Sequence, residues 1–204
     1  MTRRDLVVLA VSATGPDPQV HSAVEIAAVN TATKQAWEIV LPLSASNLAA
    51  ADPEMLHMSG YYTRGLAQIG DVRRAMLGEQ LAALSDALTG NTIGGVFPQF
   101  SAAFVHRTLA DAGLPSGWHY RLAELGALTA GAFGMEPTAI PKLSMCCRLW
   151  SVPAVDLETP HGAASAAAAC FEHLAEYNAT APGPQIIAEN DDRLSVVQDL
   201  PAGL

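Results

Sequence analysis

The chain has 204 residues, which suffices for one domain of ordinary size and is too short for two well-packed enzyme domains. Half of the residues are hydrophobic and 15% are charged, so the chain can bury a core and is not expected to be disordered throughout. Eleven basic and twenty acidic residues give a formal net charge of -9. This charge excludes nucleic-acid binding over the surface as a whole and leaves only a local basic groove as an option.

The three cysteines, Cys146, Cys147 and Cys170, lack the spacing of a zinc site or a redox motif. Their odd number and the adjacent pair predict small, buried thiols in a reduced protein. The apolar run 6–11 is shorter than the core of a signal peptide, and no segment approaches the roughly 20 apolar residues of a membrane span. We therefore expect a soluble, cytoplasmic protein with no membrane partner.

Three strands are predicted at the start of the chain. Residues 6–11 form a continuous apolar run that stops at the turn residues 14–18, as in a central strand buried on both faces. Residues 24–29 and 35–41 follow at hairpin distance, with 30–34 as the turn. The pattern favours an antiparallel meander.

Helices begin to alternate with strands further along the chain. Within the connection 44–68, Asp52 and Pro53 predict the start of a short helix that ends at Met58. Asp71 is expected to cap a longer helix that ends at Gly90 and has its leucines on one face. The other expected elements are strands at 92–97 and 121–125, the second of them weak, and helices at 101–112, 126–133, 142–150 and 162–178.

The order of these elements predicts the fold class. Three antiparallel strands followed by βα units imply an α/β fold, a mixed five-stranded sheet flanked by helices on both sides. From Pro182 onward the composition changes to Pro and Gly punctuation with few large residues. We expect one domain at residues 1–181 and a C-terminal extension at 182–204.

Three separate segments form an ordered set of motifs. The run LVVLAVSATG at 6–15 is followed by the strand VEIAAV, FPQFSAAFV lies at 97–105, and HGAASAA lies at 161–167. Together they resemble the three motifs of the DEDDh 3'-5' exonucleases, whose patterns are D-x-E-x-T-G, N-x-x-F-D-x-x-F-L and H-x-A-x-x-D-A. That family includes polymerase proofreading subunits and ribonuclease T, so the resemblance implies a ribonuclease H-like fold.

The resemblance also implies two Mg²⁺ or Mn²⁺ ions held by four carboxylates, and this chain lacks all four. The Asp and Glu of the first motif fall on Ala10 and Ser12, and the aspartates of the other two motifs fall on Ser101 and Ala166. Magnesium needs carboxylate oxygens, whereas alanine offers no ligand and a serine hydroxyl offers one weak, neutral ligand. We therefore expect these four degenerate positions to hold no metal cofactor.

Parts of the family pattern are retained in the three motifs, and the resemblance makes five of their residues candidates for a substrate cleft. They are Thr14, Gly15, Phe97, Phe100 and His161. His161 falls on the family's histidine and is a vestigial general base in this interpretation. A general base alone contributes about 10² to 10⁴ in rate, far below what phosphodiester hydrolysis requires. The alternative for His161 is a solvated or capping residue at the head of a helix.

Structural alternatives exist for the other candidates. Ser12 and Ser101 could bind a phosphate, but such hydroxyls usually bond nearby backbone groups, which is what we expect here. Phe97, Phe100 and Phe104 could stack bases, but their spacing favours a buried strand end and helix face. A serine hydrolase is disfavoured because no G-x-S-x-G elbow is present.

Three function classes follow. The favoured one is a catalytically inactive 3'-5' exonuclease-like protein, a pseudoenzyme that keeps the fold to bind a single-stranded nucleic acid end or a protein partner. The second is an active metal-dependent exonuclease with other ligands, such as Asp17, Glu25 or Glu158. The third is a structural protein that forms a homo-oligomer through its apolar surface. Many alanines with only two lysines indicate a GC-rich genome, such as that of a bacterium or its phage.

Overall fold

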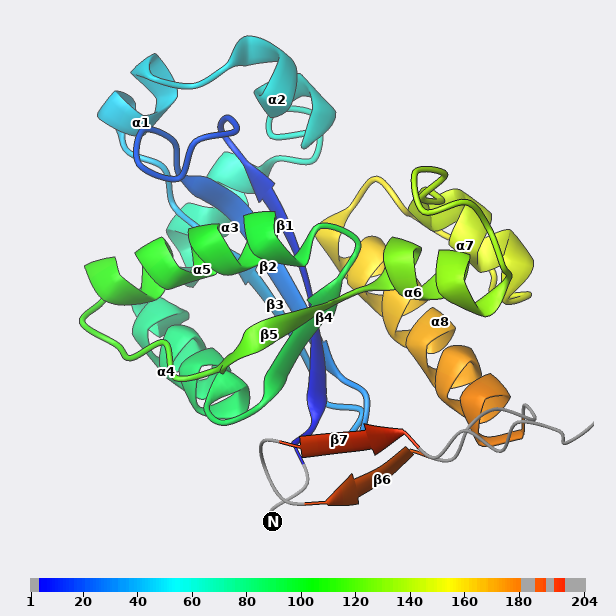
Figure 1. The fold of residues 1–204 in the computed structure, drawn as a ribbon. Helices are drawn as coiled ribbons and strands as arrows, with labels where there is room; N and C mark the ends of the chain where they lie inside the picture. Colours follow the sequence, from blue (N-terminus) through cyan, green and yellow to red (C-terminus); the bar gives the residue numbers. More distant parts are fainter. Residues whose placement is uncertain (1–3, 181–185, 190–192, 197–204) are drawn as a thin grey trace, which may run out of the picture.

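The computed structural model describes residues 4–180, 186–189 and 193–196. Its central feature is a five-stranded sheet with the strand order β3-β2-β1-β4-β5 (Figure 1). The strands are β1 (Leu6–Ala13), β2 (Ala23–Asn30), β3 (Ala36–Val40), β4 (Thr92–Gly95) and β5 (His119–Glu124). The first three are antiparallel to their neighbours, and β1, β4 and β5 run parallel. The predicted α/β fold with a mixed five-stranded sheet is confirmed.

Helices cover both faces of the sheet, as predicted. Helices α4 and α5 lie on one face, and α8 crosses the other, where it contacts β1 and β2 with α6 and α7 beside it (Figure 1). The helices are α1 (Ala45–Ala49), α2 (Pro53–Met58), α3 (Leu66–Arg73), the 3-10 helix η1 (Arg74–Met76), α4 (Leu77–Leu88), α5 (Pro98–Asp111), α6 (Leu125–Ala132), α7 (Leu143–Leu149) and α8 (Pro160–Thr180).

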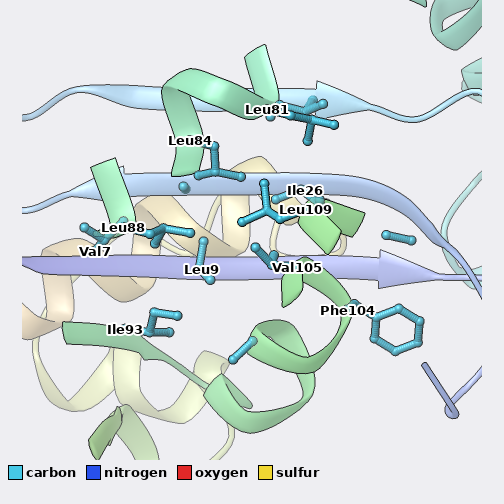
Figure 2. Close-up of a cluster of buried hydrophobic side chains, with 14 of the residues drawn as sticks. Val7, Leu9, Ile26, Leu81, Leu84, Leu88, Ile93, Phe104, Val105 and Leu109 are labelled. Atoms are coloured by element: carbon cyan, nitrogen blue, oxygen red, sulfur yellow. The ribbon is translucent and has the colours of Figure 1, made fainter. Parts of the chain in front are cut away.

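Two hydrophobic clusters sandwich the sheet because successive residues of β1 point to opposite faces. Figure 2 shows the first cluster, in which leucines of α4 and α5 pack over Val7 and Leu9 of β1. On the opposite face, Val8 packs with Phe171 of α8. This second cluster also holds Cys146, Cys147 and Cys170, all three buried as predicted. Burial on both faces explains why β1 is a continuous apolar run.

The predicted long helix beginning at Asp71 is wrong. Helix α3 begins earlier, after Gly65 in the left-handed region (φ +66°), and η1 separates it from α4. A Cβ at Gly70 would lie 3.1 Å from the Leu41 carbonyl oxygen, so α3 packs closely on the chain that follows β3. Asp71 therefore lies inside α3, and its carboxylate pairs with Arg74 at 2.7 Å instead of capping a helix.

Other boundaries differ by less. Helix α1 was not predicted and depends on a capping box between Ser44 and Asn47. Helix α5 begins at Pro98, three residues before the expected start, because proline suits the first helical position. In the predicted extension, β6 (Ile186–Glu189) and β7 (Arg193–Val196) form a two-stranded antiparallel sheet, while the boundary at 181 and 182 lies outside the described residues. None of the described helices is long and apolar enough to cross a membrane.

Candidate functional site: a cleft beyond the end of β4

A cleft of about 740 Å³ lies at the carboxyl end of β1. Strand β4 pairs with β1 only from Leu6 to Val8, and the chain then turns into α5, which leaves the second half of β1 open on that side. Figure 1 shows that α5 and α8 both start on the side towards which β1 points. The position lies at the switch between an antiparallel and a parallel neighbour of β1, and such points at the carboxyl ends of strands are where open α/β sheets bind ligands.

Three of the four degenerate ligand positions meet in this cleft. Ala10 and Ser12 share one face of β1, and Ser101 is the fourth residue of α5. The aligned fourth position, Ala166, is 6% exposed and packs in the cluster beneath α8 instead. Ala163 and Ala167, one helical turn apart, are the α8 residues that line the cleft.

One of the two serines in the cleft has unused hydrogen-bonding capacity. Ser12 Oγ is buried without a hydrogen-bond partner. Ser101 is 3% exposed and lines the same cleft. The expectation that nearby backbone groups satisfy such hydroxyls is therefore wrong for Ser12. A buried polar group without a partner costs about 1–3 kcal/mol, so the floor of the cleft suits a ligand that supplies hydrogen bonds.

Three charged residues line the cleft: Glu124 at the end of β5, Lys142 before α7 and Glu158 before α8. Within the described ranges, none of the three takes part in an ion pair, and no three His, Cys, Asp or Glu side chains lie close enough together to hold a metal ion. Clustered carboxylates are what a pair of magnesium ions requires. The residues present do not fit the two-metal cofactor that the resemblance implies.

The remaining surface of the cleft is mostly apolar. Its rim carries exposed side chains, with Met58 65%, Phe97 72% and Ile140 49% exposed. The expectation that Phe97 lies in the core is wrong because this residue precedes the first helical residue, Pro98, and its side chain turns outward. A second pocket of about 530 Å³ shares Phe97 and Glu124 with the cleft.

The other two phenylalanines lie between this rim and the core. Phe104 is fully buried, as expected, whereas Phe100 is half-buried and lines both pockets. Their ring centroids lie 4.8 Å apart. Phe100 therefore connects the cleft to the hydrophobic cluster under α5.

Thr14 and Gly15 shape the turn after β1 and are not among the residues that line the cleft. Thr14 is fully buried, and its Oγ1 accepts a hydrogen bond from the Ser22 N–H at 3.0 Å. A Cβ on Gly15 would lie 2.2 Å from the His21 ring, so a larger residue there would displace that ring. His161 is exposed as the second residue of α8 and is also absent from the cleft lining.

The alternative metal ligands are dispersed. Asp17 is exposed, and its Oδ1 accepts a hydrogen bond from the Gln19 N–H at 2.8 Å. Glu25 is fully buried, and both of its oxygens accept hydrogen bonds from Arg64, at 2.7 and 3.0 Å. These hydrogen bonds raise the pKa of the Arg64 guanidinium. Of the three alternative ligands, Glu158 alone lines the cleft.

Sequence reasoning missed several residues of the cleft, chiefly Lys142, Leu157 and the α8 face formed by Ala163 and Ala167. The i, i+4 spacing of the two alanines was a usable signal once the start of α8 was known. Lys142 and Leu157 carried no local signal because they enter the cleft from connections between elements.

Comparisons with known proteins support the fold. No protein-family model matches the sequence, and no curated protein matches it. Solved structures of exonuclease I are similar, each at 10% identity: the apo form (86% of this chain, 42% of that chain, TM-score 0.61), an ExoI/SSB-Ct complex (87%, 42%, 0.63) and the E. coli enzyme with a dT13 oligonucleotide (85%, 41%, 0.62). The likeness confirms the ribonuclease H-like fold, and the chain spans less than half the length of these proteins.

Proposed function

We propose that this chain is a catalytically inactive exonuclease-like protein that binds a partner in the cleft without cleaving it. The observation that carries the proposal is that Ala10, Ser12 and Ser101 meet in the cleft and bring no carboxylate with them. Two clustered cations need clustered anions, and phosphodiester hydrolysis in this fold family depends on such a pair. The exposed His161, outside the cleft lining, does not compensate for that loss.

The structures of exonuclease I in complex with dT13 and with SSB-Ct support a binding role for this fold, either for a single strand or for a protein. This support is an analogy at the level of the fold, and the chemistry of the cleft has to decide the partner. We assign the binding domain to residues 1–181 and place the extension 182–204 outside it.

A nuclease assay tests the proposal. The 3'-labelled single-stranded DNA and RNA oligonucleotides are incubated with the protein and Mg²⁺ or Mn²⁺, with EDTA as the control. We expect no shortening of either strand, because the cleft holds too few carboxylates. EDTA-sensitive shortening that disappears in the variant Glu124→Gln/Glu158→Gln would show that the cleft carboxylates serve as ligands and would overturn the proposal.

A further inference from the structure

We propose that the cleft binds a peptide segment of a partner protein that places a large apolar side chain next to a lysine or arginine. This inference rests on the proposed function, since it names the occupant of the same non-catalytic cleft. It uses three independent properties of the described residues: the apolar walls, the charge of the rim and the unsatisfied Ser12 hydroxyl of the floor.

The walls of the cleft provide the apolar anchor. Leu9, Val96, Leu143 and Leu157 line it from four different segments of the chain. Exposed Met58, Phe97 and Ile140 extend this surface outward along the rim. An apolar pocket rimmed by polar groups is typical of a site that takes a hydrophobic side chain of a partner.

The charge of the cleft selects against a nucleic acid strand. Glu124 and Glu158 outnumber Lys142, and the whole chain carries a formal net charge of -9. A single strand would bring phosphates next to these carboxylates, and no three metal-ligating side chains in the described residues come together to hold a neutralising cation. A basic side chain of a peptide complements the two glutamates instead, because opposite charges across an interface give specificity.

The hydroxyls of the floor favour a peptide over a purely apolar ligand. The buried Ser12 Oγ lacks a hydrogen-bond partner among the described residues, and Ser101, which is 3% exposed, lines the same cleft. A hydroxyl both donates and accepts, so it can bond the N–H or the C=O of a peptide backbone. A ligand without polar groups would cover the cleft and leave the Ser12 hydroxyl without a hydrogen-bond partner.

The test is a selection from a random peptide display library on the full chain. Enriched peptides are then synthesised, and their affinity is measured by fluorescence anisotropy. We expect enriched sequences in which an aromatic or aliphatic residue adjoins Lys or Arg. Charge pairs across an interface carry measurable affinity, so the variant Glu124→Gln/Glu158→Gln should bind such a peptide about fivefold more weakly. The matched control, Glu79→Gln/Asp86→Asn on α4, removes the same charge outside the cleft and should bind normally.

A second variant, Ala163→Phe, fills the cleft from α8 and should abolish peptide binding. Circular dichroism establishes that this variant is folded. The variant Glu124→Gln/Glu158→Gln also tests whether the peptide binds in the cleft, and it does so without changing the volume of the cleft. The inference is overturned if no peptides are enriched, if enriched peptides lack basic residues, or if they bind both cleft variants normally. It is also overturned if single-stranded oligo-dT binds in the cleft with a steep salt dependence. Nuclease activity would defeat the proposed function itself, whereas absent nuclease activity and absent peptide enrichment would defeat this inference alone.

Discussion

Two polar residues that are paired across β1 and β2 differ in whether their side chains have hydrogen-bond partners. Ser12 of β1 is directly opposite Glu25 of β2 in the antiparallel register. The Glu25 carboxylate is fully buried, and both of its oxygens accept hydrogen bonds from Arg64, whereas Ser12 Oγ is buried without a partner. A site that is satisfied within the chain stabilises the fold, and a site that lacks partners is available to a ligand.

The side of the sheet around Arg64 has the features of a structural support. A third hydrophobic cluster packs Tyr61 and Leu66, on either side of Arg64, against Val24 and Val40 of the sheet. Arg64 also donates a hydrogen bond to the Ser59 carbonyl oxygen at 3.2 Å. The segment between α2 and α3 is thus anchored to β2 by both apolar contacts and an ion pair.

The largest effect is expected when this anchor is broken. Arg64→Ala leaves the Glu25 carboxylate buried and unpaired, which should lower the free energy of unfolding by about 3 kcal/mol. This value is the lower end of the range for buried ion pairs, because the Arg64 side chain is 31% exposed. Urea denaturation measures the change. Arg74→Ala breaks the exposed pair with Asp71 and should cost less than about 1 kcal/mol. Equal losses in the two variants would contradict the comparison.

A carboxylate introduced on α8 distinguishes the cleft face from the buried face of that helix. Ala166→Asp places a charge in the cluster beneath α8 and should destabilise the protein by about 2–3 kcal/mol. Ala163→Asp places the same charge at the cleft and should cost less than about 1 kcal/mol. Thermal unfolding measures both variants, and the reverse ranking would mean that Ala166 is the residue that faces the cleft.

The buried thiols of Cys146 on α7 and Cys170 on α8 predict that the protein loses stability at alkaline pH. Burial raises the pKa of the Cys170 thiol far above its usual range and also raises the pKa of Cys146. Both groups then keep their protons in the folded state after the unfolded chain has lost them, so stability falls as the pH rises above about 8.5. The slope should reach about 1.4 kcal/mol per pH unit for each thiol. Urea denaturation between pH 7 and 10 measures it.

The matched variant for this prediction is Cys170→Ala, which removes one of the two raised thiols. It should be less stable than the wild type at neutral pH, because a buried sulfur is lost, but its stability should fall less steeply with pH. A slope equal to that of the wild type would show that Cys170 does not contribute to the alkaline transition.

The smallest effect is expected at Ser12. Ser12→Ala removes a buried hydroxyl that has no partner, so the free energy of unfolding should stay within about 0.5 kcal/mol of the wild type or rise. A loss above about 1 kcal/mol would show that the hydroxyl is satisfied in solution, which would remove the contrast with Glu25. Thr14→Ala is a useful control, because Thr14 Oγ1 accepts a hydrogen bond and its loss should be destabilising.

The fold was largely predictable from local patterns. The continuous apolar run of β1, the turn spacing of the hairpins and the leucine periodicity of α4 reflect interactions that are repeated along neighbouring residues. The prediction that Asp71 caps a helix was wrong because the start of α3 depends on how Gly70 packs against the chain after β3. That packing is a contact between distant segments. Tertiary packing overrides local capping preference in such cases.

The site was predictable in outline and not in detail. The aligned motif positions Ala10, Ser12 and Ser101 line one cleft, whereas the fourth, Ala166 on α8, does not line it. The pairing of Glu25 with Arg64 joins residues 39 positions apart and has no periodic signal. The unsatisfied Ser12 hydroxyl could not be foreseen either, since local bonding is the usual outcome for such residues.

The cleft is assembled from segments between Leu9 and Ala167, and unfolding disperses these segments. Any occupant therefore binds the native chain and has no equivalent site on the denatured one. By mass action, a ligand at a hundred times its dissociation constant adds about 2.7 kcal/mol to the free energy of unfolding. The melting temperature is then a direct readout of occupancy, and a library of compounds can be screened by heating alone, with no labelled substrate.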